Sequence, residues 1–289
     1  PYDTFRRDIS AIPADVRVAI LDSCASGALT RAKGGVSRPA FLFDATADMR
    51  GHAFLTSSSA EEAAQESDRI GASFFTHFLV SGLRGAADTT GDGLVTLNEA
   101  YAFAFQETLA STERTQFGAQ HPAYDISLTG SGDLVLTDLR AASAGLTIPE
   151  GIAGRLSIRD ERGLLAVELA KAAGQRVDLA LPAGTYAVLL DDRGQRTAAE
   201  VRIGSGRRVT LAAAQLRPVT SDRTTARGDE GFDPGDLPHE ELPVSDGDAR
   251  EGPKDVEPFH LALLPEFSFR TSRAVSVSLL IGSAAYSTR

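Results

Sequence analysis

Apolar and polar positions in the first half of the chain follow two different periods. Short apolar runs predict strands at residues 16–21 (VRVAIL), 53–58 (AFLTSS) and 133–137 (DLVLT), and the first run is typical of a strand buried on both faces. Apolar-rich segments between them predict helices across residues 72–83 and 98–111. Because alternating strands and helices form doubly wound, mostly parallel sheets, we expect an α/β domain over residues 1–140.

Past residue 140 the helical period disappears. Short strand-like runs follow one another, parted by Gly, Pro and Asp turns; they are RLSIRD, LLAVEL, RVDLAL, TYAVLLDD and RRVTLAA. Such runs predict a small, all-β, sandwich-like domain over residues 145–217. Its segment LPAGTYAVLL resembles the strand and turn of small carbohydrate- or partner-binding modules, and a structural spacer is the favoured alternative.

Charge and proline content mark a third region. Of the formal net charge of −10, most comes from residues 218–258, which hold 12 Asp and Glu against 4 Lys and Arg and carry six of the 13 prolines. This composition predicts an acidic, disordered linker. Residues 259–289 predict a β segment that either pairs with the small β domain or begins a larger β structure. The remaining parts show no basic stripe with interleaved aromatic residues, so we expect no nucleic-acid partner.

The single cysteine, Cys24, follows the first apolar run in the segment DSCASG, residues 22–27. One cysteine excludes an internal disulfide. Lone cysteines are mostly small buried hydrophobes, but polar and glycine neighbours favour a nucleophile displayed where a strand opens into the crevice at a sheet's carboxyl edge. We therefore expect Cys24 at the end of a central parallel strand, with Asp22 and the loop of residues 56–59 beside it.

Three segments of the first domain resemble caspase-like cysteine peptidases, most of all metacaspases and bacterial caspase-like proteins; they are DSCASG, GHAFLTSSSAEEAAQES and GASFFTHFLVSGL. The resemblance implies a peptidase C14 type of hydrolase, with Cys24 as nucleophile, that cleaves protein or peptide substrates after basic residues and requires no cofactor. It also implies that Asp22 lies in the primary specificity pocket, where its carboxylate pairs with Lys or, bidentately, with Arg. Ser57 and Ser58 would help to wall the substrate cleft. The alternative for Asp22 is a cap on the turn after Cys24.

A cysteine peptidase also needs a histidine base that draws the thiol towards thiolate. In this family the base lies about 50 residues before the cysteine, yet only 23 residues precede Cys24 and none is histidine. We therefore expect the chain to be a fragment that lacks its amino-terminal part and is inactive alone. A non-catalytic interaction or regulatory protein on the same scaffold is the alternative. Nothing in the sequence supports membrane association of the full-length protein, and the compartment, cytoplasm or cell envelope, stays open.

All five histidines follow Cys24, which is the wrong order for this family. We expect His77 to be a packed helix residue and His121 to fix a turn before a sheet strand. His52, next to Gly51, is a weak candidate for the base.

A second constellation lies between the two predicted helices. Residues 88–99 match the 12-residue calcium loop of an EF-hand, with acidic residues at positions 1, 5 and 12 and glycine at position 6. The predicted ligands are Asp88, Thr90, Asp92 and Glu99. Thr90 stands where Asp or Asn is usual, which predicts weak calcium binding. The alternative is a metal-free turn in which Gly93 supplies the bend and Glu99 lies in the first turn of the next helix.

Overall fold

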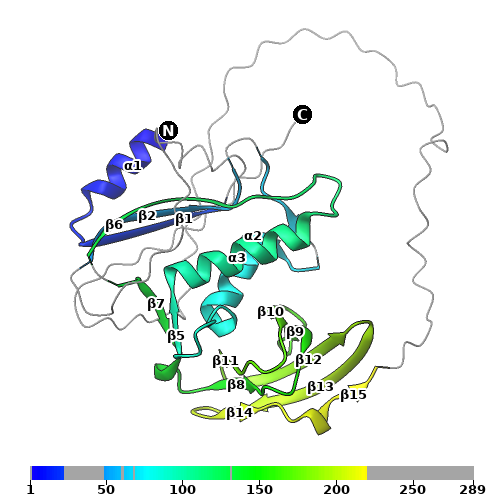
Figure 1. Ribbon diagram of the computed structural model, residues 1–289. Coiled ribbons are helices and arrows are strands. Elements are labelled where there is room, and N and C mark those ends of the chain that lie inside the picture. Colours follow the sequence, from blue (N-terminus) through cyan, green and yellow to red (C-terminus); the bar gives the residue numbers. More distant parts are fainter. Residues whose placement is uncertain (1, 23–48, 60–61, 68, 131, 220–289) are drawn as a thin grey trace, which may run out of the picture.

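The computed structural model describes residues 2–22, 49–59, 62–67, 69–130 and 132–219, and shows a mixed α/β architecture with several sheets and few helices (Figure 1). The first part contains, in chain order, α1 (Tyr2–Ala11), β1 (Val16–Leu21), β2 (Arg50–Thr56), β3 (Glu66–Ser67), β4 (Ala72–Ser73), α2 (Phe74–Ser81), η2 (Gly82–Ala86), β5 (Leu94–Thr96), α3 (Leu97–Thr112), β6 (Ala123–Thr129), β7 (Val135–Asp138) and η3 (Leu139–Ala141). The second part contains β8 (Gly145–Ile148), β9 (Gly154–Arg159), β10 (Leu165–Lys171), β11 (Val177–Ala180), β12 (Gly184–Asp192), β13 (Gln195–Ile203), β14 (Arg208–Thr210), η4 (Ala213–Gln215) and β15 (Arg217–Pro218).

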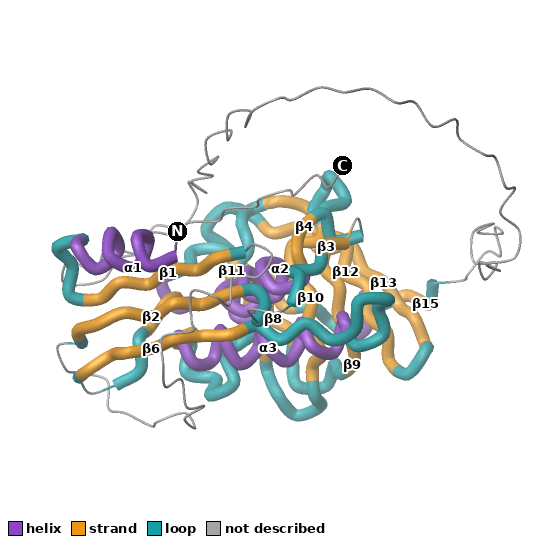
Figure 2. Tube along the Cα trace, turned by 90° about the horizontal axis from the view of Figure 1, so that it is seen from above, coloured by secondary structure: helices purple, strands orange, loops and turns teal. Residues whose placement is uncertain are grey.

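Three strands form the sheet of the first part, in the order β1-β2-β6 (Figure 2). Strands β1 and β2 are parallel, with Leu21 opposite Thr56, and β6 runs antiparallel to β2, with Ala123 opposite Thr56. Within the described residues β1 is therefore an edge strand, whereas the sequence predicted a central one. The predicted strand at residues 133–137 was also misplaced, because β7 pairs with β5 in a separate two-stranded sheet.

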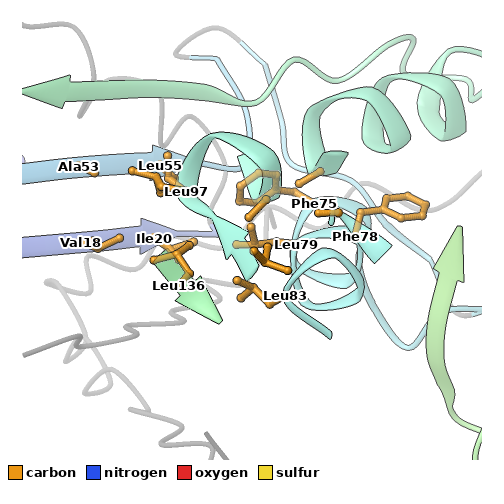
Figure 3. Close-up of a cluster of buried hydrophobic side chains, with 14 of the residues drawn as sticks. Val18, Ile20, Ala53, Leu55, Phe75, Phe78, Leu79, Leu83, Leu97 and Leu136 are labelled. Carbon is orange, nitrogen blue, oxygen red and sulfur yellow. The ribbon is translucent and has the colours of Figure 1, made fainter. Parts of the chain in front are cut away.

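The sheet is covered on both faces, as the apolar run of β1 predicted. Val18 and Ile20 point to one face, where they pack with Leu55 against α2 and α3 (Figure 3). The opposite face carries Ala19 and Phe54, which pack against α1. Helix α1 is fixed there by Arg6, whose guanidinium pairs with Asp125 at 2.6 Å and lies 4.7 Å from the centre of the Phe54 ring.

Both predicted helices of the first part exist, and their starts are set by caps. Helix α2 begins at Phe74 because the Ser73 hydroxyl accepts a hydrogen bond from the Thr76 N–H. The helix was predicted to begin at residue 72, but residues 72 and 73 form β4. Helix α3 begins with a capping box, in which Thr96 and Glu99 accept each other's backbone N–H bonds.

The second part is a β-sandwich. A five-stranded sheet, β10-β9-β12-β13-β15, faces a three-stranded sheet, β11-β8-β14, across a core built from the inward residues of both. Alternation in β12 shows the pattern, because Tyr186, Val188 and Leu190 are buried while Ala187 and Leu189 are exposed. The last strand reaches Pro218. The remainder of the predicted linker and the predicted β segment of residues 259–289 lie outside the described residues.

The sandwich packs against the helical layer of the first part, so that the order of layers is α1, sheet, α2 with α3, and sandwich (Figure 1). One close contact lies at Gly85 in η2, which has a φ of +119° and is so near β11 that a Cβ atom would sit 2.1 Å from the Asp178 carbonyl oxygen. Glycine is therefore required at this junction.

Candidate functional site

Asp22 and Ser57 lie side by side at the carboxyl edge of the sheet. The Ser57 N–H donates to the Leu21 carbonyl at 2.9 Å, which extends the parallel ladder beyond the ends of β1 and β2. Asp22 therefore stands one strand away from the loop that begins at Ser57. This is the predicted neighbourhood of the candidate nucleophile, but Cys24 itself lies outside the described residues.

The carboxylate of Asp22 is held from α2. Its Oδ2 atom accepts hydrogen bonds from the Ser73 hydroxyl and from the Thr76 hydroxyl, the latter at 2.6 Å. Ser73 is the N-cap of α2 and Thr76 lies in its first turn. Asp22 is partly buried and forms no ion pair within the part of the chain that the structure describes. Its carboxylate thus has hydroxyl partners but no cationic one.

Ser57 and Ser58, which the sequence assigned to the wall of the substrate cleft, are fully buried. The Ser57 carbonyl accepts a hydrogen bond from the Gln120 side chain at 2.6 Å, and the Ser58 carbonyl accepts one from the Thr56 hydroxyl at 3.2 Å. The Ser58 Oγ atom is buried and finds no hydrogen-bond partner among the described residues. Both residues shape the floor of this edge, and a direct contact between them and a substrate stays a prediction.

Gln65 and Gln120 join the loop that begins at Ser57 to the loop between α3 and β6. The sequence analysis identified neither residue. Gln120 is fully buried; its amide accepts from the Gln65 N–H at 2.8 Å while donating to Ser57, and its own N–H donates to the Thr112 hydroxyl at 2.8 Å. Gln65 in turn donates to the Gly118 carbonyl at 2.7 Å. No local sequence pattern predicts these partners, because the bonds that join the two loops connect residues 53 to 63 positions apart.

His121 fixes the same pair of loops, close to its predicted structural role. Its backbone N–H and its ring each make a 2.8 Å hydrogen bond with the Glu62 carboxylate. Burial alone would raise the pKa of Glu62, but these bonds outweigh it and hold the pKa below its usual value.

His52 is not placed to act as a base at the carboxyl edge. It lies four residues before Thr56 on β2, so about 13 Å of strand separates it from that edge at roughly 3.3 Å per residue. Its ring packs 4.9 Å from the Phe54 ring. Burial is the main cause that lowers the pKa of His52.

The loop of residues 88–99 is closed by its own hydrogen bonds. Asp88 accepts from the N–H groups of Gly91 and Gly93, at 2.8 and 3.0 Å, and Glu99 accepts from the N–H groups of Thr89, Thr90 and Thr96. Asp92 accepts from the Leu94 N–H at 2.8 Å. The Thr90 hydroxyl donates to Asp88 at 3.4 Å.

The electrostatics of this loop follow from the same arrangement. Burial raises the pKa of Asp88, the N–H bonds from Gly93 and Gly91 oppose this, and the charges of Asp92 and Glu99 raise it further. In the residues that the structure describes, no three His, Cys, Asp or Glu side chains converge in a way that could hold a metal ion. Calcium binding by Asp88, Thr90, Asp92 and Glu99 stays a prediction.

A second polar cluster lies where the sandwich meets α2. Glu168, on β10, is 2% exposed and accepts from Arg155 at 2.8 Å and from Arg69 at 3.3 Å, while Arg155 also pairs with Glu107 at 2.9 Å. The His77 Nε2 atom lies 3.9 Å from Glu168 and is buried, with no hydrogen-bond partner in the part of the chain that the structure describes. Burial, with help from the nearby arginines, lowers the pKa of His77 to about 4. A cleft of about 400 Å³ opens beside this cluster.

No protein-family model, curated protein or solved structure matches the chain. Among the described residues, no helix combines the length and the apolar character that crossing a membrane requires.

Proposed function

We propose that the chain belongs to a caspase-like cysteine endopeptidase that cleaves protein substrates after basic residues, on a doubly wound caspase-like sheet. The single observation that supports this most is the Asp22 carboxylate. It stands at the carboxyl end of a strand buried on both faces, two residues before Cys24, and is oriented by two hydroxyls while lacking a cation within the described residues.

A carboxylate without a cationic partner is costly to bury, and the cost falls when a cation binds it. The ammonium of Lys or the guanidinium of Arg supplies that cation, which is why Asp22 suits a pocket for basic side chains. Cys24 would be the nucleophile that attacks the carbonyl after the bound residue, with its own backbone N–H assisting as an oxyanion donor. The resemblance implies a histidine base about 50 residues before the cysteine in sequence.

A non-catalytic protein on the same scaffold is the second candidate. The positions of three histidines favour this candidate, because none of them is placed to act as a base beside Asp22. His52 lies at the far end of β2, His77 is buried on α2, and His121 is held by Glu62. It predicts binding of basic peptides at Asp22 without turnover.

The test uses the intact natural protein and fluorogenic peptides that differ only in the residue before the scissile bond. We expect cleavage after Arg and Lys, no cleavage after Asp, and loss of all activity in Cys24→Ala. Asp22→Asn should lower the preference for Lys over its neutral isostere norleucine by about tenfold to a hundredfold, the scale of one charge-assisted hydrogen bond. Binding of the basic peptides without any cleavage would favour the non-catalytic alternative, and cleavage after Asp would contradict the pocket assignment.

A further inference from the structure

We propose that Ser73 and Thr76 are positioning residues that make the Asp22 pocket accept Lys and Arg nearly equally. This inference rests on the proposed function and names its substrate selectivity. It follows from which oxygen of the Asp22 carboxylate is occupied, and it differs from the bidentate pairing with Arg that the sequence alone suggested.

Both hydroxyl bonds end on the same oxygen. Oδ2 accepts from Ser73 and from Thr76, so its two lone pairs are both in use. Within the described part of the chain Oδ1 accepts no hydrogen bond, and Asp22 is partly exposed. A ligand therefore meets a carboxylate with one open oxygen.

Lysine and arginine use a carboxylate in different ways. The ammonium group of Lys is a compact point charge that one oxygen satisfies. The guanidinium group of Arg gains most from a paired arrangement in which two N–H groups bond to both carboxylate oxygens. With Oδ2 occupied, Arg loses the second bond of that pair and keeps one charge-assisted bond, like Lys. The occupied oxygen thus removes the main advantage of Arg.

The two hydroxyls are fixed by the start of α2. Ser73 is 6% exposed, and its Oγ atom accepts the Thr76 N–H at 3.1 Å, so its only proton is available for Asp22. Thr76 is β-branched, which restricts its side-chain rotation. The cap therefore holds the Ser73 hydroxyl in place, and the restricted side chain of Thr76 favours the second bond.

The decisive variant is Thr76→Val, which keeps the shape of the side chain and removes one donor, and its matched control is Thr76→Ser, which keeps the donor. The readout is the ratio of kcat/KM for two peptides that differ only in Arg or Lys before the scissile bond, measured on the intact protein. We expect a ratio within about threefold of one in the parent and in Thr76→Ser. In Thr76→Val one lone pair of Oδ2 is freed, and the ratio should rise about tenfold in favour of Arg, the scale of one added charge-assisted bond.

A second measurement does not depend on turnover. Binding of benzamidine, a planar amidinium that pairs with two oxygens, and of n-butylamine, a single ammonium, is followed by calorimetry on the parent and on Thr76→Val. Similar affinities in the parent and a gain for benzamidine alone in Thr76→Val support the inference. A strong preference for Arg or benzamidine that Thr76→Val leaves unchanged, or no binding of either probe, overturns it. Failure of the proposed function is distinct: the intact protein then cleaves neither peptide, and the two probes still decide how Asp22 is arranged.

Discussion

The carboxyl edge of the first sheet and the junction between that sheet's helices and the sandwich each contain a carboxylate held by partners distant in sequence. Asp22 at the edge has one oxygen bonded by two hydroxyls and the other open, as far as the described residues go. Glu168 at the junction is 2% exposed and has both oxygens bonded by guanidinium groups of Arg155 and Arg69. The open carboxylate suits a ligand, and the closed one suits a fixed contact.

The difference also separates function from stability. Glu168 is itself buried and is balanced by cations of its own chain, so its removal takes a partner from Arg69 and Arg155, of which Arg155 keeps Glu107. Asp22 has neutral partners among the described residues, so its charge is available to a cation from outside. We therefore expect variants of Glu168 to change the free energy of unfolding, and variants of Asp22 to change what is bound.

The largest effect is expected for Glu168→Gln. It removes the charge that Arg155, Arg69 and the neighbouring His77 surround, and losing buried hydrogen bonds to a charged group costs about 1.5 to 3 kcal/mol when the guanidinium partners are themselves partly exposed. Urea unfolding should show a loss of about that size. The control is Glu200→Gln, an exposed acid on β13 of the same sheet, for which we expect a change within about 0.5 kcal/mol. Equal effects of the two variants would remove the distinction between a fixed and an exposed carboxylate.

At the edge, the largest loss of stability is expected for Gln120→Leu. This change keeps the volume but removes the hydrogen bonds that the Gln120 amide makes with the Ser57 carbonyl and the Gln65 N–H, at a cost of about 2 kcal/mol. Gln106→Leu, on the exposed face of α3, is the control and should be nearly neutral. If Gln120→Leu is as stable as the parent, the two loops do not depend on this amide.

The junction should also make stability depend on pH through His77. Glu168, Arg69, Arg84 and Arg155 are the charged groups that face its ring, and burial lowers its pKa to about 4 from an unfolded value near 6.5. A depressed histidine pKa means that the unfolded chain binds the proton more readily. Its contribution is therefore complete above pH 6.5 and is lost as the pH falls towards 4.

Between pH 7 and pH 5 this loss amounts to about 2 kcal/mol. It is measured as the difference between the pH dependence of the parent and that of His77→Leu, in which the other titrating groups cancel. If the two curves of unfolding free energy against pH run parallel, the pKa of His77 does not differ between the folded and unfolded states.

Part of this architecture is readable from the sequence, and the part that is not has a physical cause. The apolar run of residues 16–21 and the alternating apolar residues of the sandwich strands can be recognised in the sequence. The end of the first strand, just before Cys24, gives the position of Asp22. The partners of Asp22 are not readable, because Ser73 and Thr76 are brought to it from 51 and 54 residues away by the packing of α2. Ser73 before an apolar helix is a capping signal that indicates the start of α2 but not what its hydroxyl meets.

Strand pairing was the other failure. The run at residues 133–137 has the right period for a strand, but period does not choose a partner, and β7 pairs with β5. Strand β6 and helix α1 were missed. The apolar residues Tyr124, Ile126 and Leu128 of β6 do alternate with polar ones, so a strand signal was present there and was overlooked.

The smallest effect is expected in the loop of residues 88–99, for Glu99→Gln. The Glu99 carboxylate receives N–H bonds from Thr89 and Thr90 on one oxygen and from Thr96 on the other, which closes the loop and completes the cap of α3. In Glu99→Gln an amide NH₂ group replaces one carboxylate oxygen and faces backbone N–H groups, which are also donors. The loss should cost about 1 kcal/mol without calcium, the usual size of a lost cap. If the loop binds calcium with a Kd near 0.5 mM, about 5 mM calcium adds roughly 1.4 kcal/mol to the parent and less to Glu99→Gln. If calcium leaves the melting temperature of the parent unchanged, this loop is a turn closed by its own carboxylates. In the same way, Asp22 would have only a structural role if no basic ligand bound to it.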